Sequence, residues 1–171
     1  MFQLFFVVIA VLGASIHLAL SRKRRASGAA VAETYLLYLF VIYVGLMGIL
    51  TTYAHVFLPV QTSASIGWST SPYEYEVGMA DLTVGVLGIL CVWFRGNFWL
   101  ATAIANFVWL EGDAIGHVRQ VLESNNHARN NSGLFLYMEI MIPALILLLT
   151  LYHRHKIAVA ESDKAASSTH D

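Results

Sequence analysis

The sequence is poor in charged residues and in cysteine, and each shortage excludes a class of protein. Only 12% of its 171 residues are charged, against about 25% in soluble domains, whereas 57% are hydrophobic. A soluble enzyme of this length would need more charge to cover its surface, and a disordered chain would have fewer apolar and aromatic residues. Because Cys91 is the only cysteine, an intrachain disulfide and a multi-cysteine metal site are excluded. The composition therefore predicts a membrane protein.

Long apolar segments account for most of the chain. A helix needs about 20 apolar residues to cross a hydrocarbon core about 30 Å thick. Five segments meet or approach this length: 2–20, 33–58, 73–94, 98–122 and 134–152. The segments between them are polar, basic or rich in small residues, and residues 153–171 form a charged tail. We therefore predict an all-α polytopic bundle of five transmembrane spans in one domain, residues 1–152, followed by a polar tail.

The distribution of lysine and arginine predicts the orientation of these spans. Five alternating spans place the following basic residues on one side: Arg22, Lys23, Arg24, Arg25, Arg95, Arg154 and Lys156. The opposite side has only Arg119 and Arg129. Because cytoplasmic loops carry the excess of Lys and Arg, we predict that the N-terminus lies outside and the tail in the cytoplasm. The basic runs are short and flank apolar segments, so we expect no nucleic-acid partner.

Ionisable residues inside the predicted spans are the strongest functional signal, because such groups are costly at membrane depth. At about 1.5 Å per residue, four of them lie roughly 3–9 Å below the outer ends of four different spans. These four are His55, Glu76, His117 and Glu139. Asp81 and Asp113 lie about 12 Å deep, and Glu111 lies a little deeper. The inner half holds few such groups, which predicts a polar centre in the outer leaflet.

Two histidines and two carboxylates on four helices are ligands typical of iron, zinc or manganese. We therefore predict one divalent metal ion bound by His55, Glu76, His117 and Glu139. Asp113 lies four residues before His117 on the same helix face, so we expect it to fix the tautomer of that histidine. Asp81 and Glu111 are expected to support the ligands or relay protons, although Glu111 lies about 120° from His117 around the helix. A bound metal would activate water, as in a membrane metalloenzyme acting on a small or lipophilic substrate.

Two other functions are compatible with the same carboxylates. Intramembrane acids also mark proton or ion pathways, so a proton- or ion-coupled carrier or channel is one alternative. The apolar middle of every span argues against a continuous path. The other alternative is an accessory subunit or a homo-oligomer, because glycine pairs let a second helix approach closely. Such pairs are Gly45 with Gly48 and Gly112 with Gly116.

Some of these residues also have a purely structural interpretation. His55 lies close enough to the interface to be an ordinary hydrated histidine. Glu74 is near Glu76 but points to another face of the helix, and we predict that it is exposed. Asp81 and Asp113 are the hardest to explain in this way, because aspartate is costly in lipid and a poor helix former.

The last three predicted spans contain a characteristic set of glycines and acids. It consists of Tyr75-Glu76-Val77-Gly78-Met79-Ala80-Asp81-Leu82, Gly85, Leu87-Gly88, Gly116-His117, Glu139 and Pro143. This pattern resembles a family of small uncharacterised bacterial integral membrane proteins. The resemblance implies a multi-span protein of the bacterial inner membrane without an established activity, and it marks Glu76, His117 and Glu139 as positions of interest. Position 81 is more often Asn in that pattern, so Asp81 is a departure from it.

Overall fold

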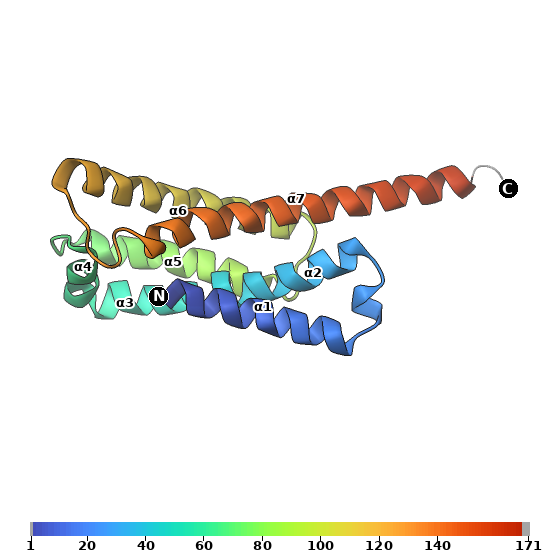
Figure 1. Cartoon of the computed structure of the whole chain (residues 1–171), viewed down its shortest axis with the longest axis horizontal. Helices are drawn as coiled ribbons and strands as arrows, with labels where there is room; N and C mark the ends of the chain where they lie inside the picture. Colours follow the sequence, from blue (N-terminus) through green and yellow to red (C-terminus); the bar gives the residue numbers. More distant parts are fainter. Residues whose placement is uncertain (1, 169–171) are drawn as a thin grey trace.

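The structure is a computed structural model, and it describes residues 2–168. This part of the chain is helical and contains no strand (Figure 1). Its elements are α1 (Phe2–Leu20), the short 3-10 helix η1 (Lys23–Arg25), α2 (Gly28–Tyr38), the π-helical η2 (Leu39–Leu46), α3 (Met47–Phe57), α4 (Pro59–Ile66), α5 (Tyr73–Leu90), α6 (Asn97–Ser124) and α7 (Leu134–Ser168). The long helices run side by side along one axis (Figure 1). The prediction of an all-α bundle is confirmed.

One continuous helix, Gly28–Phe57, is formed by α2, η2 and α3. Ser27 caps its first turn, because the Ser27 hydroxyl accepts a hydrogen bond of 3.2 Å from the backbone N–H of Ala30. The helix ends at Phe57 because Pro59 disfavours a helical conformation at the residue before it. Pro59 then opens α4, where a proline at the first helical position costs nothing.

Glycines let α5 pack closely against η2 and α3. A Cβ atom on Gly48 would lie 2.8 Å from the Cα of Gly85, and one on Gly88 would lie 2.6 Å from the backbone N of Gly45. No real side chain tolerates such distances, so the two backbones can approach only because these positions are glycine. Gly45 and Gly48 thus serve the packing of helices within this chain. Gly112 on α6, by contrast, is exposed and has open space around it.

Three helices in the described part of the chain are long and apolar enough to cross a membrane, namely α1, the Gly28–Phe57 helix and α7. The chain is therefore a membrane protein by length and composition of its helices. The remaining two predicted spans correspond to α5 and α6, which lie alongside the others (Figure 1). α5 carries three acidic residues, Glu74, Glu76 and Asp81, which lower its hydropathy. The count of five spans stays a prediction.

The second span begins at Gly28 and α5 ends at Leu90, a few residues from their predicted limits, and two other segments differ more. Residues 59–72, expected to be a loop, contain α4, and Gly67 caps the end of this helix with a φ of 73°. A left-handed residue of this kind is a common helix terminus. At the other end of the chain, α7 continues to Ser168, and its residues 155–168 are exposed and project beyond the bundle (Figure 1). No proline or glycine follows Pro143 in this helix, so nothing in the sequence interrupts it.

Candidate functional site

A cavity of about 560 Å³, here called the site cavity, lies at the end of the bundle where α6 leads into α7. We call this the site end. The cavity is lined by residues of α1, η2, α3, α4, α5, α6 and α7, and most of its wall is apolar. Its ionisable lining residues are His55, Glu74, Asp81, Asp113, His117 and Glu139. The structure thus brings together five of the seven predicted site residues, His55, Asp81, Asp113, His117 and Glu139.

The first cluster in the cavity surrounds His55, and both of its carboxylates are hydrogen-bonded. His55 Nδ1 lies 2.7 Å from Oε2 of Glu74, and the Ser63 hydroxyl donates to Oε1 of the same carboxylate at 2.5 Å. On the other side of the ring, His55 Nε2 faces Oδ2 of Asp81 at 4.0 Å. Trp109 Nε1 donates to Oδ1 of Asp81 at 2.9 Å. The imidazole therefore lies between two carboxylates, and each carboxylate has a further donor.

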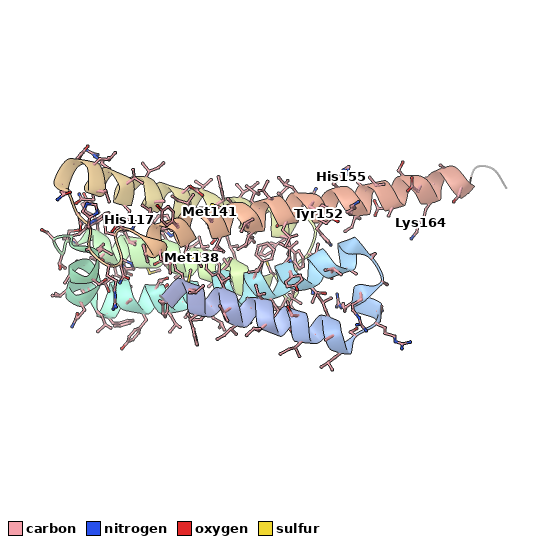
Figure 2. The ribbon with its side chains drawn as sticks, viewed as in Figure 1. His117, Met138, Met141, Tyr152, His155 and Lys164 are labelled. Atoms are coloured by element: carbon pink, nitrogen blue, oxygen red, sulfur yellow. The ribbon has the colours of Figure 1, made fainter. Side chains whose placement is uncertain are left out.

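The second cluster surrounds His117, which lies at the site end of α6 (Figure 2). His117 Nδ1 lies 2.8 Å from Oδ1 of Asn131. Trp68 Nε1 donates to the same oxygen at 3.0 Å, and Nδ2 of Asn131 donates to the backbone O of Asn126 at 2.9 Å. These two bonds identify the amide oxygen, which can only accept, so Nδ1 carries the proton of the ring. The other nitrogen, Nε2, faces Oε2 of Glu139 at 3.6 Å.

Asn131, and not Asp113, orients His117, so the predicted role of Asp113 is corrected. Asp113 shares the cavity with His117, but among the described residues the partner of Nδ1 is the Asn131 amide. The physical reason is the path of the loop between α6 and α7, which folds back over the end of the bundle. Asn126 Nδ2 holds this loop by donating to the backbone O of Ile66 at 2.8 Å, which brings the buried Asn131 onto the ring.

Three residues that line the cavity have buried polar atoms without a hydrogen-bond partner in the described part of the chain. These atoms are Gln3 Oε1, Asn106 Nδ2 and Glu139 Oε2. More than about 90% of buried polar groups in proteins are hydrogen-bonded, and an unpaired one costs about 1–3 kcal/mol. Glu139 is only 4% exposed, so bulk water does not satisfy its oxygen. The cavity therefore needs water or a ligand with both donors and acceptors.

The structure does not bring Glu76 or Glu111 to the site. The buried face of α5 consists of Glu74, Gly78, Asp81, Gly85 and Gly88. Glu76 lies about 200° further around the helix from Glu74 and is exposed, whereas Glu74, which we predicted to be exposed, is buried against His55. Glu111 does not line the cavity either, as its angle from His117 indicates. The buried residues of α5 are separated alternately by four and three positions, and Glu74 fits this pattern. The sequence therefore contained the information that places Glu74 on the buried face.

A metal centre has no ready set of ligands in the described residues. No group of three or more His, Cys, Asp or Glu side chains among them is placed to hold a metal ion. The two histidines belong to separate clusters, and the predicted ligand Glu76 is exposed. The metal ion itself stays a prediction that no observation here tests.

Apart from Glu74, the site residues that sequence reasoning missed are uncharged. Ser63, Trp68, Asn106, Trp109 and Asn131 complete the two clusters or line the cavity. Asn106 had a detectable signal, because it shares the inward face of α6 with Leu110, Ala114 and His117 at helical spacing. The contacts of the other four depend on loops and helices distant in sequence, so no local pattern indicated them.

Comparison with known proteins gives a family but no activity. A family model described as "Family of unknown function (DUF6790)" matches residues 1–158. The match includes the first two predicted spans, so it extends well beyond the last three spans on which the resemblance rested. A search of curated proteins gives no match, and a search of solved structures gives none either.

Proposed function

The chain belongs to a family of unknown function, DUF6790, and we propose that it is an integral membrane protein that binds a small organic amine in the site cavity. The single observation that carries this proposal is the pair of acceptors at the cavity wall, His117 Nε2 and Glu139 Oε2. They lie 3.6 Å apart, and the carboxylate oxygen has no donor. A nitrogen with two N–H donors, placed beside the pair at about 2.9 Å from each atom, would satisfy both.

The size and charge of the cavity support an organic amine. A volume of about 560 Å³ lies within the range of small-molecule pockets, about 300–1,000 Å³, and greatly exceeds the space that one ion needs. Four carboxylates and two imidazoles line it, so negative charge predominates when the carboxylates are ionised. An ammonium group next to Glu139 would compensate part of this charge.

The apolar wall of the cavity favours a ligand whose remaining part is apolar. Met47 and Leu110 line the cavity beside the polar clusters, together with the rings of Trp68, Trp109 and Phe135. Aromatic faces attract cations, and the aliphatic side chains favour an apolar body. We therefore expect the preferred ligand to combine one primary or secondary amine with a hydrocarbon or aromatic part.

We further propose that the site end faces the outside of a bacterial inner membrane and that α7 ends in the cytoplasm. The distribution of basic residues supports this orientation. Arg22–Arg25, Arg95, Arg154 and Lys156 lie toward the end opposite the site cavity, whereas the site end has Arg119 and Arg129. With five spans, the cavity would open to the external solution or to the outer leaflet.

A divalent metal ion, iron, zinc or manganese, is the second candidate ligand. The same gap between His117 Nε2 and Glu139 supports it, because an imidazole nitrogen and a carboxylate are ligands for these ions. Two protein ligands leave the remaining positions to water or substrate, as in a metalloenzyme. Elemental analysis of the detergent-purified protein and of the variants His117→Ala and Glu139→Ala tests this candidate. A stoichiometric metal that both substitutions remove would favour it over the amine.

Binding of phenethylamine to the detergent-purified protein, measured by calorimetry, tests the main proposal. We expect the amine to bind at least tenfold more tightly than 2-phenylethanol, which has the same body without the charge. Glu139→Gln is expected to weaken amine binding at least tenfold, because the amide has one acceptor fewer and no charge. Glu76→Gln is the matched control on an exposed site and should bind like the wild type. Equal affinity for amine and alcohol, or unchanged binding in Glu139→Gln, would overturn the proposal.

A further inference from the structure

A second cavity, here called the opposite cavity, lies toward the other end of the bundle. It has a volume of about 420 Å³ and is lined mainly by residues of α7, including Thr150 and His153, together with Glu33 of α2, Arg95 of the turn before α6, and Trp99 of α6. His117 at the site cavity and Tyr152, which adjoins His153, lie well apart along the bundle (Figure 2). The two cavities thus enter the bundle from opposite directions.

Only a short barrier separates the two cavities. On α6, Asn106 lines the site cavity and Trp99 lines the opposite cavity, and the separation of seven positions corresponds to about 10 Å. On α7, Glu139 and Thr150 are about 16 Å apart by the same measure. A hydrocarbon core is about 30 Å thick. The cavities therefore leave about a third to a half of that thickness closed.

The barrier is tightly packed, yet it contains polar atoms that lack partners. Its residues Phe40, Tyr43, Thr102, Ala103 and Ile146 are all fully buried. Among the described residues, the Tyr43 hydroxyl has no hydrogen-bond partner. The Thr102 hydroxyl has only the nearby Cys91 thiol, which is a weak acceptor. Asn106 Nδ2, at the floor of the site cavity, is also unpaired. Buried polar groups of this kind in or beside the barrier are costly unless water bridges them.

We infer that the two cavities form the two halves of a proton path, and that the hydroxyls of Tyr43 and Thr102 carry the proton across the barrier through hydrogen-bonded water. A hydrated ion or an organic ligand has no passage through fully buried side chains. A proton needs no open passage, because each hydroxyl or water along the path accepts one proton and releases another. One proton enters from one cavity and one leaves to the other, driven by the electrochemical gradient, and no bond is changed overall.

This function goes beyond ligand binding, because neither Tyr43 nor Thr102 lines the site cavity. The test uses the full-length protein in liposomes that contain a pH-sensitive dye, with a potassium gradient and valinomycin to impose a membrane potential. We expect acidification several-fold faster than in empty liposomes. Tyr43→Phe and Thr102→Val, which remove only the hydroxyls, should each lower the rate at least fivefold. The matched controls are Tyr137→Phe and Thr83→Val, at exposed positions, which should retain the wild-type rate.

Folding and ligand binding are measured on the same preparations. Tyr43→Phe removes a buried unpaired hydroxyl, so its thermal unfolding midpoint should equal or exceed that of the wild type. A slow rate in this variant would then result from loss of the proton path and not from unfolding. Its affinity for phenethylamine should be unchanged, so failure of the path and failure of the amine site are distinguishable. A wild-type rate equal to that of empty liposomes would overturn the inference. Unchanged rates in both hydroxyl variants would do the same.

Discussion

The two clusters in the site cavity contain the same kinds of residue but differ in how completely they are hydrogen-bonded. In the His55 cluster, both oxygens of Glu74 have partners, and Asp81 receives the Trp109 N–H. In the His117 cluster, one side of the ring is held by Asn131, whereas the other side meets a carboxylate oxygen without a donor. We interpret the first cluster as structural and the second as the place where a ligand is bound. Substitutions in the two clusters should therefore differ in their effects on stability and on ligand binding.

Removal of the Glu74 carboxylate should have the largest effect on stability. Glu74→Ala leaves His55 Nδ1 and the Ser63 hydroxyl without their shared partner in a nearly buried setting. We expect a loss of about 2–3 kcal/mol in the free energy of unfolding, measured by denaturant titration in detergent. Ser63→Ala, which removes one donor only, should cost less. Wild-type stability in Glu74→Ala would contradict a structural role for this cluster.

Loss of the Asn131 amide should destabilise the protein less and also weaken the ligand site. Asn131→Ala removes the acceptor for both His117 Nδ1 and Trp68 Nε1. We expect a loss of about 1–2 kcal/mol in unfolding free energy, because the two N–H groups lose one shared partner. The ring of His117 also loses its fixed tautomer, so phenethylamine should bind several-fold more weakly. His127→Ala, in the same loop but exposed, is the control and should leave both measurements unchanged.

Neutralising Glu139 should leave stability almost unchanged. Glu139→Gln keeps the shape of the side chain and removes a buried carboxylate that has an unpaired oxygen. We expect an unfolding free energy within about 0.5 kcal/mol of the wild type or above it, in contrast to Glu74→Ala. Denaturant titration of the two variants side by side gives the comparison. A loss as large as that of Glu74→Ala would remove the distinction between the clusters.

Substitution at Glu76 should have the smallest effect of all. Glu76→Ala changes an exposed side chain on the face of α5 that points away from the cavity. Exposed substitutions of this kind usually change stability by less than about 0.5 kcal/mol. Amine binding and unfolding should both equal the wild type. A clear loss of binding would show that Glu76 reaches the site and would restore its predicted role.

Periodicity explains why some site residues were predictable and others were not. His117 and Glu139 were found because an ionisable group in an apolar helix is conspicuous in any sequence. The choice of Glu76 over Glu74 as a site residue was wrong for a different reason. Both residues lie at a similar depth below the end of the helix, and they differ only in the direction in which they point from the helix axis. The positions of Gly78 and Asp81 define the buried face of α5 and so indicate that Glu74 lies on it. The prediction considered only depth and therefore selected Glu76.

Contacts across long distances in the sequence could not be predicted. Asn131 reaches His117 because Asn126 anchors its loop to the backbone of α4, and nothing in either segment encodes the other. The barrier between the cavities is a further example. Tyr43 and Thr102 look like ordinary residues of apolar helices, and their unpaired hydroxyls become visible only when the surrounding helices are packed.

Three properties of this protein can be read directly from its amino-acid sequence: it is helical, its helices α1, Gly28–Phe57 and α7 are apolar enough for a membrane, and α5 and α7 carry buried acids. These properties depend on local composition and on the helical period, which any single segment displays. Tertiary structure alone decided that Glu74 pairs with His55, that Asn131 orients His117, and that Glu139 keeps an unpaired oxygen. Hydrogen-bond satisfaction is a property of the packed chain, because each donor and its acceptor come from different elements.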